Sequence, residues 1–240
     1  MKKLLLLLAC TMLNACASVA PFSYQTEPKL LKKEDVSLKV VVPPFQDTRL
    51  KDNSSNVLCL TGLMIVPLLP YCSIHEFNRP EFNQFGVPHV NVPEDFAKAT
   101  ANELESASIF KSVTFSFDRD DGDLILIGNV KKMFLDDVGT YYGLTVYGGF
   151  ALGLLGAPLD YNHRLLEIEY KLLTPSFDVL FEKNYTVKKN SHVGMWTFKT
   201  AFEFDNMLKQ INMEFIADVK KNVGVLKKLA PTTKKLKAQK

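Results

Sequence analysis

The residue types that most often do chemistry are present in this chain of 240 residues, but their spacing completes no catalytic or metal site. None of the four histidines belongs to the two-histidine helical pair of a zinc protease. They are His75, His89, His163 and His192. Ser191 and His192 are neighbours in sequence, which does not make a nucleophilic triad. We therefore expect a protein that is not an enzyme and holds no metal or cofactor.

The start of the chain combines two lysines, a short apolar run and a cysteine. Lys2 and Lys3 precede Leu4 to Ala9, and Leu13-Asn14-Ala15-Cys16 follows. This pattern resembles a bacterial lipoprotein signal peptide, in which cleavage before the cysteine leaves that cysteine as the lipidated first residue. The resemblance implies that residues 1–15 are a signal peptide rather than part of the fold, and that Cys16 is a lipid anchor. Ala17-Ser18 after it, instead of an aspartate, favours the outer membrane, with the protein facing the periplasm.

Two alternatives to this anchor stay open. An ordinary secretory signal could be cleaved among the small residues Ala15-Cys16-Ala17, and Cys10 offers a second lipidation position with a cramped apolar core before it. A membrane-spanning helix is not one of the alternatives, because a span needs roughly 20 apolar residues and this run is far shorter.

The two remaining cysteines, Cys59 and Cys72, agree with export. In an oxidising periplasm they can form a disulfide. The loop that it closes would stabilise the fold by about 3 kcal/mol on the chain-entropy model. Metal binding is the alternative, but two cysteines without a nearby ligand pair make a poor zinc site.

The basic character of the chain comes from its two ends. Removing Lys2, Lys3 and the six lysines of residues 224–240 from the net charge of +3 leaves −5 for residues 16–223. A nucleic-acid partner is therefore not expected. The lysine-rich tail is either a solvated terminus or a contact for anionic lipid or an anionic polymer.

The hydrophobic patterns predict one domain over residues 36–223, joined to the anchor by a linker over residues 16–35. The fold class we expect is α+β: a two-layer sandwich of a mixed or antiparallel sheet, about four or five strands, with two helices on one face. Strands are predicted at 36–42, from Phe110, at 124–130, 165–173 and 179–187, with a turn at 45–49. Helices are predicted from Pro93 to about Ser108 and from Met195 to Val223.

Two uncharged inserts, residues 54–74 and 138–159, interrupt these elements. Six glycines weaken a helix in the second insert, since each costs about 1 kcal/mol relative to alanine. The two inserts either cover each other and the open sheet face, or form an apolar patch for a partner, a lipid tail or the membrane surface. The candidate surface consists of Leu63, Ile65, Leu68, Tyr71, Tyr147, Phe150 and Leu154.

Two further features accompany the lipoprotein signal. They are the segment Val-Val-Val-Pro-Pro-Phe-Gln-Asp-Thr-Arg at 40–49 and a helix that leads into Ile109-Phe110-Lys111-Ser112-Val113. With them the chain is similar to small envelope lipoproteins with a two-layer α/β domain, including curli-secretion-type lipoproteins and auxiliary lipoproteins of ABC-type lipid transporters. The resemblance implies a non-catalytic accessory that contacts envelope proteins in transport, secretion or assembly. A lipid- or glycan-binding carrier with a pocket between residues 60–71 and 141–159 is the alternative. A hydrolase using Asp47, His192 or another lone polar residue is a third hypothesis.

Overall fold

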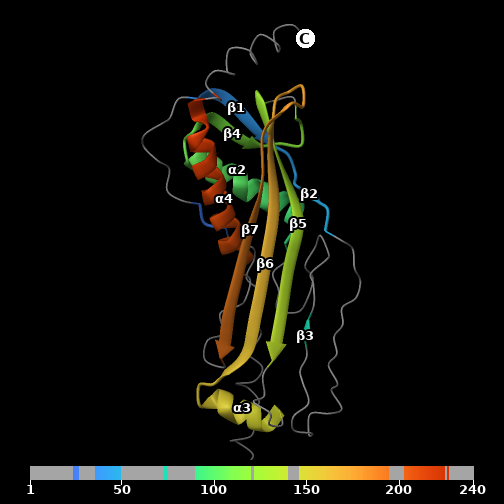
Figure 1. Ribbon diagram of the computed structural model, residues 1–240, viewed down its shortest axis with the longest axis vertical. Coiled ribbons are helices and arrows are strands. Elements are labelled where there is room, and N and C mark those ends of the chain that lie inside the picture. Colours follow the sequence, from blue (N-terminus) through green and yellow to red (C-terminus); the bar gives the residue numbers. More distant parts are fainter. Residues whose placement is uncertain are drawn as a thin grey trace, which may run out of the picture.

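The computed structural model describes residues 24–26, 36–49, 73–74, 90–119, 122–139, 146–194, 203–224 and 226. The strands are β1 (Val36–Val42), β2 (Gln46–Asp47), β3 (Ser73–Ile74), β4 (Phe110–Phe115), β5 (Leu124–Gly139), β6 (Pro158–Leu173) and β7 (Val179–Gly194). The helices are α2 (Val92–Ser106), α3 (Val146–Leu154) and α4 (Phe204–Lys221). The main sheet has the order β4-β1-β5-β6-β7, and α2 and α4 cover one face of it (Figure 1). The predicted two-layer α+β fold is confirmed.

The sheet is mixed because its two sides are connected differently. β1 runs parallel to both β4 and β5, whereas β5, β6 and β7 form an antiparallel meander. A parallel neighbour requires a long crossover, often through a helix, and α2 lies on the connection from β1 to β4. β1 therefore occupies the central position that its apolar sequence predicted.

The segment at 45–49, predicted as a turn, instead extends the sheet. Its residues Gln46 and Asp47 form β2, which pairs in parallel with Asn129 and Val130 of β5. Pro43 and Pro44 separate β2 from β1, and neither has a backbone N–H to donate to a strand ladder. The turn prediction was wrong because pairing with a distant strand overrode the local turn signal.

The core lies between the sheet and the two covering helices. α2 starts with Pro93 in its first turn and carries Glu94 and Asp95 there, where the helix dipole favours acids. The stripe predicted for α4 is buried at Leu208, Ile211, Phe215 and Val219, while the expected start of this helix, residues 195–202, lies outside the described residues. The Phe215 ring packs 4.7 Å, centroid to centroid, from Tyr170 of β6.

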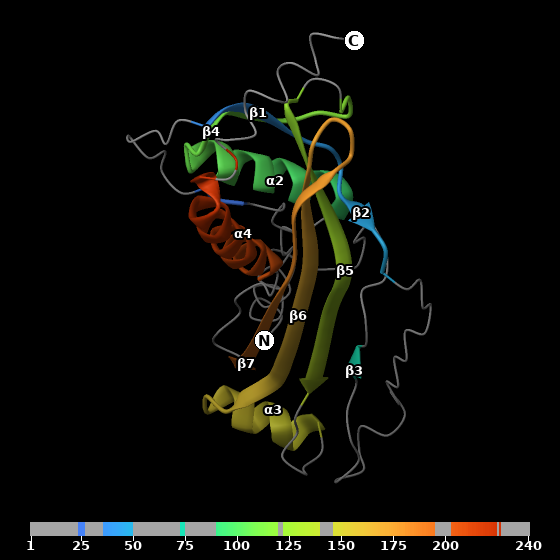
Figure 2. The same cartoon turned by 45° about the horizontal axis from the view of Figure 1, so that its top comes forward.

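β5, β6 and β7 are longer than predicted, with 16 residues each. These strands extend beyond α4, and α3 lies at their far end, as Figures 1 and 2 show. We call residues 135–139, 158–164 and 189–194 the arm, and the rest of the sheet with α2 and α4 the body. The strand predictions stopped at polar pairs such as Lys131-Lys132 and Lys188-Lys189, but antiparallel strands with a solvated face tolerate such residues.

The second uncharged insert is not a loop throughout: Val138 and Gly139 end β5, Pro158 and Leu159 begin β6, and α3 lies between them. The glycines were expected to weaken a helix here, and the helix that forms has only nine residues and packs against β6, since tertiary packing overrides a weak propensity. Gly156, with φ of +96°, ends the helix. The amides of Gly156 and Ala157 donate to the carbonyls of Gly153 and Leu152, which is the Schellman arrangement.

Candidate functional site

The residues predicted to do chemistry or bind a partner fall mostly outside the described part of the chain. This is true of Cys16, Cys59, Cys72, Leu63, Ile65, Leu68 and Tyr71. Tyr147 and Phe150 lie in α3, and of these two residues only the backbone is described. Leu154, the last residue of α3, is the member of the candidate surface with a described side chain, and 46% of it is exposed.

The end of the arm is apolar and open to solvent. Leu155 follows Leu154 and is 84% exposed. α3 carries no charged residue in its sequence Val-Tyr-Gly-Gly-Phe-Ala-Leu-Gly-Leu. Among the described residues, no helix is long and apolar enough to cross a membrane. We call α3 with Leu155 the tip. The helix lies at the end of the long strands that is away from α2 and α4 (Figure 2), and Leu154 and Leu155 are exposed there.

One face of the arm is polar. Tyr161 of β6 packs edge to face on His192 of β7, with ring centroids 4.6 Å apart. Two residue pairs nearer the body, the Nδ1 atom of His163 lies 2.9 Å from Oδ1 of Asn190. Both histidines are exposed and lie on strands rather than in loops. The described residues contain no group of three histidine, cysteine or acidic side chains that could hold a metal ion.

The base of the arm contains a buried cation that the sequence reasoning missed. The side chain of Arg164 is 1% exposed, and its Nη1 atom donates to Oγ of Ser191 (2.9 Å) and to Oε2 of Glu203 (3.0 Å). Lys189 lies 3.0 Å from the same Glu203 oxygen. Glu203 immediately precedes α4. These contacts tie the start of α4 to β6 and β7 at the level where the arm begins.

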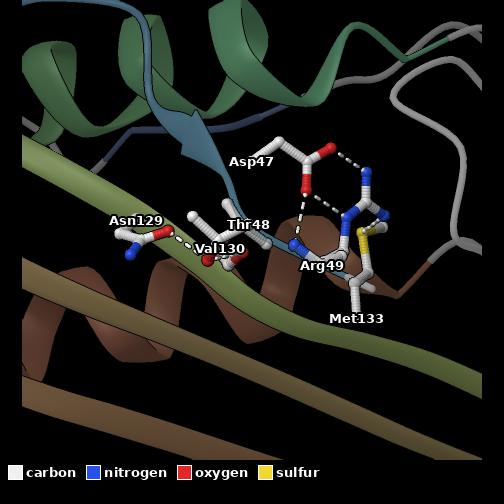
Figure 3. Close-up of polar contacts among 6 residues, drawn as sticks. All are labelled: Asp47, Thr48, Arg49, Asn129, Val130 and Met133. Atoms are coloured by element: carbon white, nitrogen blue, oxygen red, sulfur yellow. Dashed lines mark hydrogen bonds and ion pairs between the residues drawn. The ribbon is translucent and has the colours of Figure 1, made fainter. Parts of the chain in front are cut away.

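A second buried arginine fixes the segment that carries the Pro-Phe-x-Asp pattern (Figure 3). Arg49 donates from Nε and Nη2 to the two carboxylate oxygens of Asp47, at 2.7 and 2.6 Å, and its Nη1 lies 3.6 Å from the sulfur of Met133. Thr48 donates to Oδ1 of Asn129 (2.7 Å) on β5. The carboxylate of Asp47 thus has a structural partner, and the pattern serves to attach β2 to β5.

The phenylalanine of this pattern, Phe45, requires a glycine on the neighbouring strand. A Cβ atom added to Gly128 of β5 would lie 2.5 Å from ring carbons of Phe45. Phe45 is buried and packs edge to face on Tyr170. The Pro-Phe-x-Asp pattern is therefore matched to Gly128, a pairing that sequence inspection did not identify.

The body contains a buried polar network between α2, α4 and β6. Oδ1 of Asn212 accepts hydrogen bonds from the Tyr170 hydroxyl (2.7 Å) and the Thr100 hydroxyl (3.1 Å). The Asn212 amide donates to the hydroxyl of Tyr24 (2.9 Å), which also hydrogen-bonds Glu103. Burial raises the pKa of Tyr24 and of Tyr170 above the ordinary range. Both phenols therefore stay protonated, so Tyr170 remains a hydrogen-bond donor.

Comparison with known proteins gives little further information. No protein-family model and no curated protein match the chain. Among solved structures, it is similar to a protein from Helicobacter pylori described as a neuraminyllactose-binding hemagglutinin homolog, with a TM-score of 0.44 and 11% sequence identity. The likeness covers 88% of this chain and 100% of that chain. A likeness of this degree assigns neither a family nor a function to the chain.

Proposed function

We propose that this chain is a lipid-anchored lipoprotein of the outer membrane that faces the periplasm. In this proposal it is a non-catalytic accessory to envelope transport, secretion or assembly, and it binds a protein partner through the tip. The support for the anchor is the sequence pattern from Lys2 to Cys16. The support for the binding role is the apolar tip.

The composition of the tip is the observation that carries the binding role. A connection that only joins two antiparallel strands can be short, and it is usually made of Gly, Asn, Asp and other polar turn residues. Here the connection between β5 and β6 includes the uncharged helix α3 and ends with two exposed leucines, Leu154 and Leu155. Single exposed leucines are ordinary, but adjacent ones on an uncharged helix are typical of an interface.

The contrast with the rest of the arm strengthens this reading. The described side chains nearer the body are polar, including His163, Asn190 and the Arg164–Glu203 pair. A polar support that ends in an apolar contact suits a protein partner, because the support stays soluble while the tip is buried on binding. The tip also lies away from the core of the body, so covering it leaves the fold intact.

A photo-crosslinking experiment in living cells tests the proposal. A photoreactive amino acid is placed at position 155 in the full-length chain, and at position 213 as the matched control. Met213 lies on α4 and is 52% exposed, so it samples an exposed apolar side chain on the body. A Cys16→Ser version of each protein separates partner binding from membrane attachment.

The proposal predicts a discrete protein adduct from position 155 that is absent from position 213 and reduced in the Cys16→Ser background. Adducts of equal strength from both positions would contradict a specific role for the tip. Adducts from position 155 to lipid or glycan alone would replace the accessory function with the carrier hypothesis. A Cys16→Ser protein that still fractionates with membranes would overturn the lipid anchor.

A further inference from the structure

Tyr24 lies within the segment that the sequence assigns to a linker, yet it is bound to the body. Its hydroxyl contacts Asn212 of α4 and Glu103 of α2. Its ring packs against the hydrophobic core as a partly buried side chain. Figure 2 shows residues 24–26, the short dark-blue segment, beside α4. The linker segment thus has a fixed point only eight residues after Cys16.

Breaking this contact is unfavourable in free energy, because the partners of Tyr24 are buried. Asn212 and Thr100 are fully buried, and Glu103 is nearly so. If Tyr24 left, the Asn212 amide and the Glu103 carboxylate would each lose a hydrogen-bond partner. Water would have to enter between the two helices to replace it, because unpaired buried polar groups are unfavourable. The bound state of Tyr24 is therefore favoured over a free linker.

We propose that Tyr24 is a clamp that shortens the membrane tether and thereby sets the orientation of the protein; this inference rests on the lipid anchor of the proposed function. A fully extended chain from Cys16 to Tyr24 spans at most about 28 Å. A free linker from Cys16 to β1 would span about 70 Å on the same measure. The clamp holds the α2–α4 side of the body close to the membrane that carries the lipid.

The short tether limits what the tip can touch. Tyr170, which shares Asn212 with Tyr24, lies 12 residues along β6 from Pro158. At the usual rise of a strand this separation is about 40 Å. An arm pointing straight at the anchoring membrane would therefore need a longer tether than the clamp leaves. The tip consequently does not point straight at its own leaflet, and the proposal places it in the periplasm, where a protein partner can reach it.

Lipid-quenching measurements on the full-length lipidated protein test the clamp. The protein is reconstituted in phosphatidylethanolamine–phosphatidylglycerol vesicles that contain nitroxide-headgroup lipid, with a fluorescent amino acid at position 213 or 155. The variants are Tyr24→Ala, which removes the clamp, and Tyr24→Phe, which keeps the ring and removes the hydroxyl. Tyr161→Ala is the matched control, because it removes a partly buried tyrosine from the arm.

In the unmodified protein we expect quenching at position 213 and little at position 155. Tyr24→Ala is expected to reduce quenching at 213 about twofold, because the freed linker lengthens the mean separation from the membrane; Tyr24→Phe should give a smaller loss and Tyr161→Ala none. Equal quenching at 213 in Tyr24→Ala and unmodified protein, with both bound to vesicles, would overturn the clamp alone. Quenching at 155 as strong as at 213 would overturn the orientation. Failure of the unmodified protein to bind vesicles more than Cys16→Ser would instead overturn the anchor, and the clamp proposal with it.

Discussion

The three antiparallel strands serve two different purposes along their length. In the body their helix-facing side is built from large apolar side chains such as Ile168, Tyr170 and Tyr185. In the arm, at Arg164, Lys189 and Ser191, the described side chains on that side are polar and bond one another or Glu203. The difference teaches that strand length and helix coverage are separate properties. The hydrophobic alternation reports where a helix covers the sheet, and says little about where the hydrogen-bonded ladder ends.

The largest expected difference between the body and the tip of the arm is in the free energy of unfolding after one alanine substitution in each. Phe215→Ala should lower the free energy of unfolding by about 3–5 kcal/mol, because the ring is fully buried and packs on Tyr170, Tyr185 and Phe181. Leu155→Ala at the tip should change it by less than about 0.5 kcal/mol. Urea denaturation measures both. A comparable loss from Leu155→Ala would mean that the tip is part of the cooperative core.

The junction between the two regions should show the next largest effect. Arg164→Ala removes a buried partner of Glu203, and we expect a loss of about 2 kcal/mol, less than for a fully buried pair because Lys189 still contacts that carboxylate. The matched variant Lys189→Ala removes a more exposed cation and should cost under about 1 kcal/mol. Urea denaturation again gives the values. Equal losses for the two variants would show that burial of Arg164 is not what joins arm and body.

A close contact on the body side of β5 gives a test of similar size. Gly128→Ala would place a Cβ atom 2.5 Å from the Phe45 ring, and overpacking of this kind costs about 1–3 kcal/mol. Gly224→Ala is the control, since a Cβ there meets no atom within 4 Å. The comparison uses thermal unfolding of both variants. An unchanged midpoint for Gly128→Ala would mean that Phe45 can move without penalty.

The smallest expected effect depends on pH. The pKa of Asp218 is lowered to about 2, mainly because Lys183 donates a hydrogen bond to its carboxylate. The Tyr185 hydroxyl donates to the same carboxylate and lowers the pKa further. Because the folded pKa lies below the ordinary value, the stabilisation is present above about pH 4 and is lost as the pH falls towards 2. Lys183 is half exposed, so water screening limits the effect to about 1 kcal/mol. Asp218→Asn should flatten the stability profile between pH 4 and 2, and an unaltered slope would contradict this assignment.

The parts of the fold that sequence inspection predicted depend on local and periodic signals. The strand at 36–42 and the stripe Leu208, Ile211, Phe215 and Val219 were found because burial on one side imposes a period of two or 3.6 residues. Gly156 is typical of a Schellman helix end and could have indicated where α3 stops, but no helix end was predicted from it. The anchor at Cys16, the disulfide between Cys59 and Cys72 and the outer-membrane location stay predictions.

The candidate site was harder to predict, because its residues come together from distant parts of the chain. Tyr24 and Asn212 are separated by 188 positions, and Arg164 and Glu203 by 39. Neither pair has a sequence signature, since residue identity alone does not distinguish a buried arginine or asparagine from an exposed one. Asp47 was noticed as a lone polar residue, but its partner Arg49 was not recognised as buried.

The amino-acid order was enough for the class of fold, the central place of β1 and the apolar, uncharged character of residues 138–159, because these follow from composition and short-range periodicity. Only the folded chain decided that β5, β6 and β7 continue beyond the helices, that α3 forms despite its glycines, and that Tyr24 binds between α2 and α4. The physical reason is common to all three. Each is stabilised by hydrogen bonds or packing to residues far away in sequence, and such contacts exist only after the sheet and its helices have assembled.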